Sequence, residues 1–174
     1  MALEIIDISI KNFEKIPKPC KYCLYWQTCG PFSPSSISPE MKYKKREWII
    51  RTLDDFGKCG YIILFDGSSV GFVQYAPARF FPRIRDYKSE TLDEGAIFIA
   101  CLYIVERRLR RKGFGSVILK HLIKDLRARG FKAIETFARK KSEENPSGPL
   151  EFYLKYGFKI KEDINDFPLV RLEL

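Results

Sequence analysis

Short apolar segments alternate along the chain with polar breaks rich in glycine or proline, and each segment has the length of one helix or strand. Residues 59–65 and 70–75 are rich in β-formers, and the intervening Asp66-Gly67-Ser68-Ser69 predicts a β-hairpin. Residues 96–105 are apolar without alternation, which predicts a central strand covered on both faces. Two further strands are predicted at residues 131–137 and 167–174.

Three segments carry helix signals. Ser38, Pro39 and Glu40 combine an N-cap, a first-turn proline and an early acid, which predicts a helix from there to about Phe56, closed by Gly57. A second helix is predicted between Gly115 and Gly130, with one apolar face made of Ile118, Leu119, Leu122, Ile123 and Leu126. Residues 149–156 form a short third helix. A strand, a helix and a strand in that order predict a parallel βαβ crossover within a mixed sheet.

The composition narrows the class of protein. The chain has 174 residues, 45% of them hydrophobic, which is enough for one core and short for two full domains. The longest uncharged apolar run, residues 95–105, is below the about 18 to 20 residues that cross a bilayer. The N-terminus has acids where a signal peptide has basic residues, and five cysteines are too few for a secreted disulfide scaffold. We therefore expect a single-domain cytoplasmic protein.

The charge favours an anionic partner. The formal net charge is +9, and residues 101–174 hold 17 basic and 10 acidic residues, against 14 and 12 in residues 1–100. Much of this charge lies in the basic run 107–112, which by itself is compatible with a solvated surface, a phosphate site or a nucleic-acid patch. The mixture of arginine and phenylalanine in residues 79–85 also keeps RNA binding open.

Gly113 and Gly115 mark the turn between the central strand and the second helix. Glycine lets the backbone approach a ligand closely, and the free amides of a helix start attract phosphate. A dinucleotide fingerprint needs a third glycine where Ile118 stands, and a Walker loop needs Gly-Lys-Ser/Thr where this chain has Gly115-Ser116-Val117. Neither of these two phosphate-binding patterns is present.

What remains is Arg110-x-x-Gly113-x-Gly115, which resembles the acyl-coenzyme A motif of the GNAT superfamily of N-acetyltransferases. Residues 152–158, Phe-Tyr-Leu-Lys-Tyr-Gly-Phe, resemble the Leu-Tyr-x-x-x-Gly-Phe signature that ends this family. The resemblance covers residues 59–174, and residues 1–58 match more loosely. It implies one GNAT-like α/β domain over residues 1–174: a mixed, twisted, mostly antiparallel sheet with flanking helices, in which two central parallel strands splay apart at the acetyl-CoA cleft. Residues 59–174 would be its acetyl-CoA-binding core and residues 1–58 a variable part.

The resemblance also implies an activity and a set of site residues. The expected reaction is transfer of an acetyl group from acetyl-CoA to a primary amine by direct attack in a ternary complex. Tyr153 is the expected general acid for the departing thiolate. The expected cofactor-binding residues are Tyr103, Ile104 and Val105 beside the pantetheine arm, Arg110 and the turn residues Arg111, Lys112, Gly113, Phe114, Gly115 and Ser116 at the pyrophosphate, and Asn145.

Two features of the reaction remain open at this point. Because an alkylamine with a pKa near ~10.4 is mostly protonated at neutral pH, a base or a water relay is expected, and Glu94 and Asp93, just before the central strand, are the candidates for the base. The acceptor pocket is expected from residues 11–39 and 77–94.

The alternatives to an enzyme are a non-catalytic acyl-CoA sensor on the same fold and an RNA- or ribosome-associated basic protein. A homodimer is compatible with the family.

The N-terminal part contains Cys20-x-x-Cys23-x-x-Trp26 and Cys29. A structural zinc site needs four ligands, and the nearest fourth is the distant Cys59, so we expect these thiols to pack as apolar groups or to form a disulfide rather than to bind zinc. The element is similar to one in a subset of GNAT-like proteins, which indicates no substrate. His121, which lies off the apolar face of its helix, is expected on the surface, and Cys101 in the core.

Overall fold

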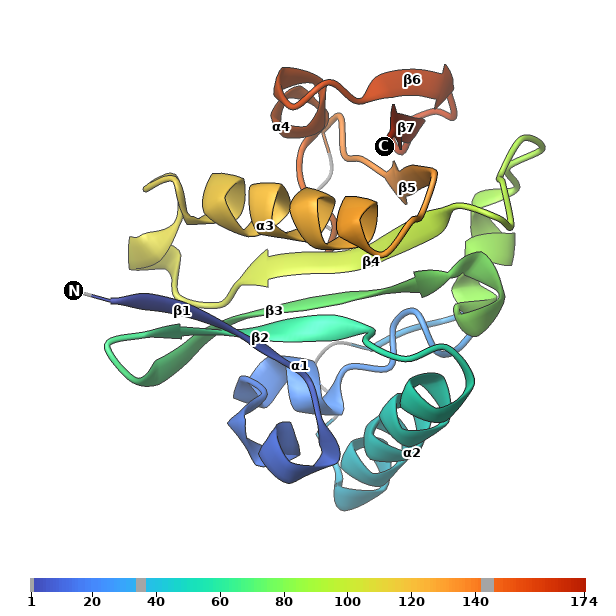
Figure 1. The fold of residues 1–174 in the computed structure, drawn as a ribbon. Helices are drawn as coiled ribbons and strands as arrows, with labels where there is room; N and C mark the ends of the chain where they lie inside the picture. Colours follow the sequence, from blue (N-terminus) through green and yellow to red (C-terminus); the bar gives the residue numbers. More distant parts are fainter. Residues whose placement is uncertain (1, 34–36, 142–145) are drawn as a thin grey trace.

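Seven strands form one continuous sheet with helices on both faces, as Figure 1 shows. The structure is a computed structural model that describes residues 2–33, 37–141 and 146–174. The strands follow the spatial order β1-β2-β3-β4-β5-β7-β6, and neighbouring strands are antiparallel except for β4 and β5. Their bounds are Leu3–Asp7 (β1), Gly60–Phe65 (β2), Ser68–Pro77 (β3), Ile97–Ile104 (β4), Ala133–Phe137 (β5), Lys159–Glu162 (β6) and Leu169–Glu173 (β7).

The helices lie on opposite faces of this sheet. Helices α1 (Lys18–Tyr22) and α2 (Pro39–Asp55) cover one face of the sheet, and α3 (Phe114–Ala128) covers the other. Helix α4 (Leu150–Lys155) lies close to α3 (Figure 1). Within the described ranges, no helix is both long and apolar enough to cross a membrane. Short 3₁₀ helices occupy Ile10–Lys15, Ala78–Phe80, Pro82–Tyr87 and Arg107–Leu109.

Burial on both faces explains why the central strands are apolar throughout. In β2, Tyr61 and Ile63 join the core cluster under α3, whereas Ile62 and Leu64 join the cluster under α2. Successive side chains of a strand point to opposite faces, so a strand covered on both sides has no position that favours a polar residue. The continuous apolar run at residues 96–105 becomes β4 for the same reason.

Helix α3 is fixed to the sheet by its apolar face and by one polar cluster. Ile118, Leu119, Leu122 and Leu126 are fully buried and Ile123 is partly buried against the same core, which confirms the predicted face. At the end of the helix, Asp125 accepts hydrogen bonds from Tyr61 in β2 and from Arg129, and Arg129 donates to the Tyr75 hydroxyl. The distances are 3.0, 3.2 and 2.9 Å. Burial raises the pKa of Tyr75 to about 12, so this cluster holds a neutral phenol at physiological pH.

The two parallel strands separate soon after they meet. Strand β4 pairs with β5 only at Ile97 opposite Ile134 and Phe98 opposite Glu135. Beyond these pairs β4 continues to Ile104 alongside β3 alone, after a register shift between Gln74 and Tyr75 of β3. The predicted parallel βαβ unit and its splay are therefore confirmed.

Two strands lie outside the segments that the sequence analysis predicted. Strand β1 pairs with β2 from Leu3 opposite Phe65 to Asp7 opposite Tyr61, at the edge of the sheet. Strand β6, Lys159–Glu162, is mostly exposed, so it carries no apolar pattern. Both are edge strands, where backbone pairing rather than burial defines the element.

Candidate functional site

A cavity of about 780 Å³ passes through the sheet where β4 and β5 separate. One end is bounded by Gly113, Gly115 and Ser116 at the start of α3. Its middle is bounded by residues 101–104 of β4 and by residues 146–149. The other end lies between the α2 face of the sheet and the N-terminal part, which contributes side chains including those of Cys20, Tyr25, Trp26, Phe32 and Lys45.

The backbone at the first end has the form of an anion site. Gly113 has φ +86° and Arg111 has φ +60°, so the chain turns sharply into the helix. The first hydrogen bond of the helix joins the Val117 amide to the Gly113 carbonyl at 3.1 Å. The amides of residues 114–116 precede this bond and therefore lie outside the helical ladder. Together with the helix dipole they favour a phosphate group.

Arg110 joins this turn to the end of β4. Its Nε donates to the Ile104 carbonyl and its Nη2 to the Tyr103 hydroxyl, both at 2.8 Å, and its guanidinium lies 4.9 Å from the centre of the Tyr103 ring. Arg110 lines the cavity, but these contacts give it a positioning role that the sequence motif alone does not reveal. The Ile104 carbonyl, expected beside the pantetheine arm, here accepts from Arg110.

Tyr153 lies directly behind the cavity wall. It is fully buried, and its hydroxyl is 3.3 Å from Ser147 Oγ and 3.4 Å from the Gly148 amide. Ser147 and Gly148 line the cavity, and Ser147 Oγ also lies 3.1 Å from Thr136 Oγ1. Burial raises the pKa of Tyr153, which keeps the phenol protonated at neutral pH. The hydroxyl of Tyr153, the predicted acid, is therefore separated from the cavity by the Ser147 hydroxyl.

The residue predicted as the base precedes β4, at the end of the strand away from the cavity lining. Glu94 is exposed and precedes the first residue of the strand, whereas the cavity meets β4 at residues 101–104. Asp93 is held by Arg171 at 2.9 Å and accepts from the Gly95 amide, and these bonds, the Arg171 one foremost, lower its pKa. Neither Asp93 nor Glu94 is among the described residues that line the cavity. The structure therefore does not bring this candidate to the site, because an extended strand separates the two.

The other predicted site residues divide into two groups. Of the expected cofactor-binding residues, Tyr103, Ile104, Arg110, Arg111, Gly113, Gly115 and Ser116 line the cavity. Val105, Lys112 and Phe114 do not line it, and Asn145 lies outside the described residues. The N-terminal segment reaches the cavity as expected, but no residue of the predicted range 77–94 lines it.

Lys45 is the functional candidate that the sequence analysis missed. It lies on the inner face of α2, is fully buried and lines the cavity. Its Nζ donates to the Cys23 carbonyl and to Gln74 Oε1, both at 2.9 Å, and lies 5.3 Å from the centre of the Phe72 ring. The one sequence signal is that Lys45 stands three and four residues before Trp48 and Ile49, which are buried on the same face.

The five cysteines are unpaired. Cys20 and Cys101 are buried against the cavity, and Cys29 is exposed. Burial raises the pKa of Cys20 to about 12, so by itself this thiol is neutral at physiological pH. In the described part of the chain, no group of three or more His, Cys, Asp or Glu residues is placed to hold a metal ion. His121 is exposed and Cys101 is in the core, as predicted.

Comparison with known proteins agrees with this arrangement. A model of the acetyltransferase (GNAT) family matches residues 21–158. The structure of the PaiA N-acetyltransferase of Thermoplasma acidophilum in complex with coenzyme A superposes with a TM-score of 0.64 at 17% identity, covering 100% of both chains. A GNAT-family acetyltransferase of Streptococcus pneumoniae gives 0.67 at 13% identity, covering 99% of this chain and all of the other.

A third structure is that of a GNAT-family acetyltransferase of Brucella melitensis in complex with acetyl-CoA. It gives a TM-score of 0.58 at 13% identity and covers 99% of this chain and 88% of the other. A search of curated protein sequences gave no match. At these identities the structural likeness establishes the fold, and the family model establishes the family.

Proposed function

Since the chain belongs to the GNAT family of acetyltransferases, we propose that it moves an acetyl group from acetyl-CoA to the amine of a second substrate in a ternary complex. The observation that carries this proposal is the continuity of the cavity. The same cavity extends from the turn at residues 113–116, which has the form of a phosphate-binding site, to the space under α2. It passes through the gap between β4 and β5. Two substrates entering from opposite faces of the sheet would meet at that gap.

The proposed cofactor site fits acetyl-CoA on three grounds. The unpaired amides of residues 114–116 suit a pyrophosphate. The described lining contains Arg107, Arg111 and Lys155, whose positive charge suits the other phosphate of the nucleotide. The edge of β4 beyond Phe98 has no strand partner on its β5 side, which suits an extended pantetheine arm.

In the proposed reaction the neutral amine attacks the thioester carbonyl carbon, the carbon–sulfur bond breaks, and the thiolate takes up a proton. Tyr153 supplies this proton by way of Ser147, whose hydroxyl lines the cavity and donates to the Tyr153 hydroxyl in the resting structure: Ser147 gives its proton to the thiolate and takes up the proton of Tyr153. The proton that the amide nitrogen loses after the attack returns through water to the Tyr153 phenolate, so the acid is regenerated. The acceptor ammonium loses its proton to water in the cavity before attack. This water relay replaces the role predicted for Glu94, which is exposed before the start of β4.

The test combines calorimetry with thiol release. Acetyl-CoA should bind saturably to the protein, and Gly113→Glu should abolish binding because it adds a strained side chain and a negative charge to the nest. With an amine panel, Tyr153→Phe should keep acetyl-CoA affinity and reduce the rate of thiol release by about 10²-fold or more. Binding without turnover on any amine would instead indicate a sensor. Salt-dependent RNA binding without coenzyme A binding would indicate a nucleic-acid protein.

A further inference from the structure

The chamber under α2 contains a buried cation with no acidic partner among the described residues. Lys45 is fully buried, and both of its hydrogen-bond partners, the Cys23 carbonyl and Gln74 Oε1, are neutral oxygens. No ion pair of the described part of the chain includes Lys45. An isolated buried ammonium is costly, and burial accordingly lowers the pKa of Lys45. A bound anion beside it would restore the charged form.

A second donor on the same wall also has no hydrogen-bond partner. The indole Nε1 of Trp26 is buried and unpartnered in the described structure, in a side chain that is only 1% exposed. Trp26 and Lys45 both line the cavity, and Lys45 is bonded to the backbone three residues before Trp26. An indole N–H is a donor only, so a ligand that satisfies it must offer an acceptor atom.

The rest of the wall combines apolar and aromatic side chains with neutral polar and basic ones. Tyr25, Phe32 and Phe72 line the same cavity; the Phe72 ring lies 5.3 Å from Lys45 Nζ, and the Tyr25 ring packs edge-on against Trp26. None of the described residues that line the cavity is an aspartate or a glutamate. A polyamine or an aminoglycoside, with several positive charges, would find no counter-charge on this wall, whereas an acceptor with one negative group and an apolar body would fit both parts of it.

We propose that the acceptor is a small amine that also carries a carboxylate, an α-amino acid with an apolar or aromatic side chain, and that Lys45 binds its carboxylate. This assignment rests on the proposed function, because it names the second substrate of the same cavity. Lys45 is then a specificity-determining residue: it distinguishes an amino acid from the corresponding amine that lacks the carboxylate. The Trp26 indole supplies a further hydrogen bond, and the aromatic wall holds the side chain.

The experiment uses matched acceptor pairs. Thiol release from acetyl-CoA is measured with the full chain for phenylalanine against phenethylamine, for leucine against isoamylamine, and for spermidine. Each amino acid should have a kcat/KM at least about 30-fold above that of its decarboxylated partner, because the partner leaves a buried charged group unpaired. The difference should lie mainly in KM, since the carboxylate contact exists before and during the reaction.

Lys45→Met removes the charge and keeps a side chain of similar length. The ratio of kcat/KM between each amino acid and its decarboxylated partner should fall close to one. Acetyl-CoA affinity, measured by calorimetry, should stay unchanged. Lys44→Met is the matched control, because Lys44 is the adjacent residue of α2, is exposed, and among the described residues forms an ion pair with Glu40 alone. It should leave every ratio as in the wild type. Lys45→Met also removes the hydrogen bond from Nζ to the Cys23 carbonyl, so a lower thermal midpoint is expected, and unchanged acetyl-CoA affinity shows that the fold is kept.

The outcomes separate the two proposals. Acetyl-CoA binding with equal or better turnover of phenethylamine, isoamylamine or spermidine overturns the carboxylate assignment and leaves the acetyltransferase intact. Acetyl-CoA binding with no turnover of either amino acid overturns it as well. A Lys45→Met variant in which kcat falls equally for all acceptors and the pH profile loses an ionisation shows a base rather than an anion site. Failure to bind acetyl-CoA refutes the proposed function itself.

Discussion

Gly115→Ala is expected to make the protein more stable and its cofactor binding weaker. Gly115 stands in the first turn of α3 and, unlike Gly113, does not have a positive φ. A methyl group there would meet two ring carbons of Phe152 at 3.5 Å, which is an ordinary contact. Glycine in a helix costs about 0.5–1 kcal/mol relative to alanine, so the variant should gain up to that amount. This corresponds to roughly 1–4 °C in thermal midpoint for a chain of this length.

In the proposed cofactor site, the same methyl group stands in the turn where a phosphate would approach the backbone. Loss of one hydrogen bond to a charged group costs about 1.5–3 kcal/mol, which raises the Kd for acetyl-CoA by roughly 10- to 150-fold. Thermal unfolding without ligand gives the first quantity and calorimetric titration with acetyl-CoA gives the second. Opposite signs in the two measurements separate a binding effect from a folding defect.

Two glycines at the ends of α3 supply the controls. Gly113 and Gly130 have φ +86° and +84°, and neither has an atom within 4 Å of an added Cβ. Alanine should therefore cost about 1–2 kcal/mol of stability at each, from backbone strain alone. Only Gly113→Ala should weaken acetyl-CoA binding, because Gly130 is at the far end of the helix. If Gly115→Ala and Gly113→Ala both bind acetyl-CoA as the wild type does, the phosphates do not lie on this turn.

Two further predictions concern stability. Leu122→Ala should destabilise the protein by about 2–5 kcal/mol in urea unfolding, because Leu122 is fully buried between α3 and the sheet; a loss below 1 kcal/mol would contradict the packing. Hydrogen bonds from the Ser89 hydroxyl, the Glu90 amide and Thr91 hold the pKa of Glu162 at about 2, below its ordinary 4.5. The ionised group therefore stabilises the fold above pH 4.5, and this contribution is lost as the pH falls towards 2. Glu162→Gln should lower the urea midpoint at pH 7 and match the wild type near pH 2; an equal difference at both pH values would refute this.

Elements that bury side chains at a regular spacing could be predicted from the amino-acid pattern alone. The apolar face of α3, the continuous run of β4 and the hairpin of β2 and β3 were predictable because each buries side chains at a fixed period. The turn at Gly113 and Gly115 was predictable because it lies between a buried strand and an amphipathic helix, where the free amides of the helix start can bind an anion. Strands β1 and β6 left no such pattern, since edge strands are specified by backbone pairing with distant residues.

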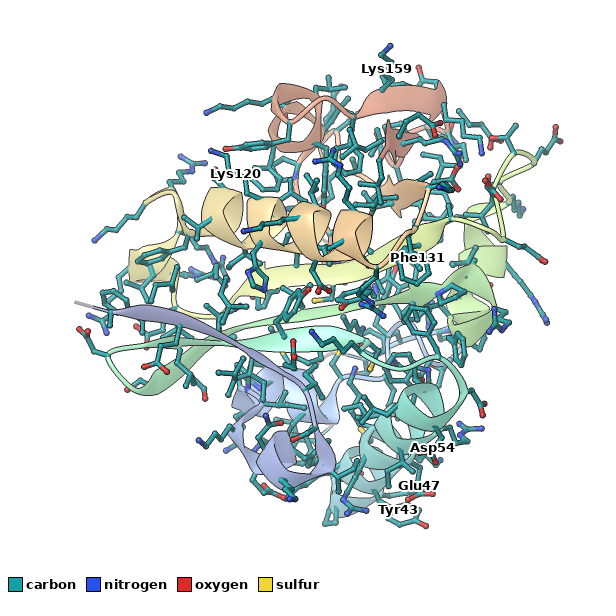
Figure 2. All side chains as sticks on the ribbon, viewed as in Figure 1. Tyr43, Glu47, Asp54, Lys120, Phe131 and Lys159 are labelled. Carbon is teal, nitrogen blue, oxygen red and sulfur yellow. The ribbon has the colours of Figure 1, made fainter. Side chains whose placement is uncertain are left out.

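Which side chains share the cavity depends on how distant elements pack, and the amino-acid pattern does not show this. Glu94 lies just before the central strand in the sequence and yet is remote from the gap between β4 and β5. The cavity meets β4 at residues 101–104, and the first part of this extended strand separates them from Glu94. Lys45 lies in a charged stretch of the sequence, a pattern typical of a solvent-exposed helix face. Figure 2 shows the neighbouring Tyr43 and Glu47 on the outer side of α2, away from the sheet. Because each residue of an α-helix is rotated by about 100° from the one before, Lys45, two positions from both, faces inward against Gln74 of a strand distant in the sequence. Local pattern specifies which face of an element is buried, but the partners of a buried charge depend on how the elements pack.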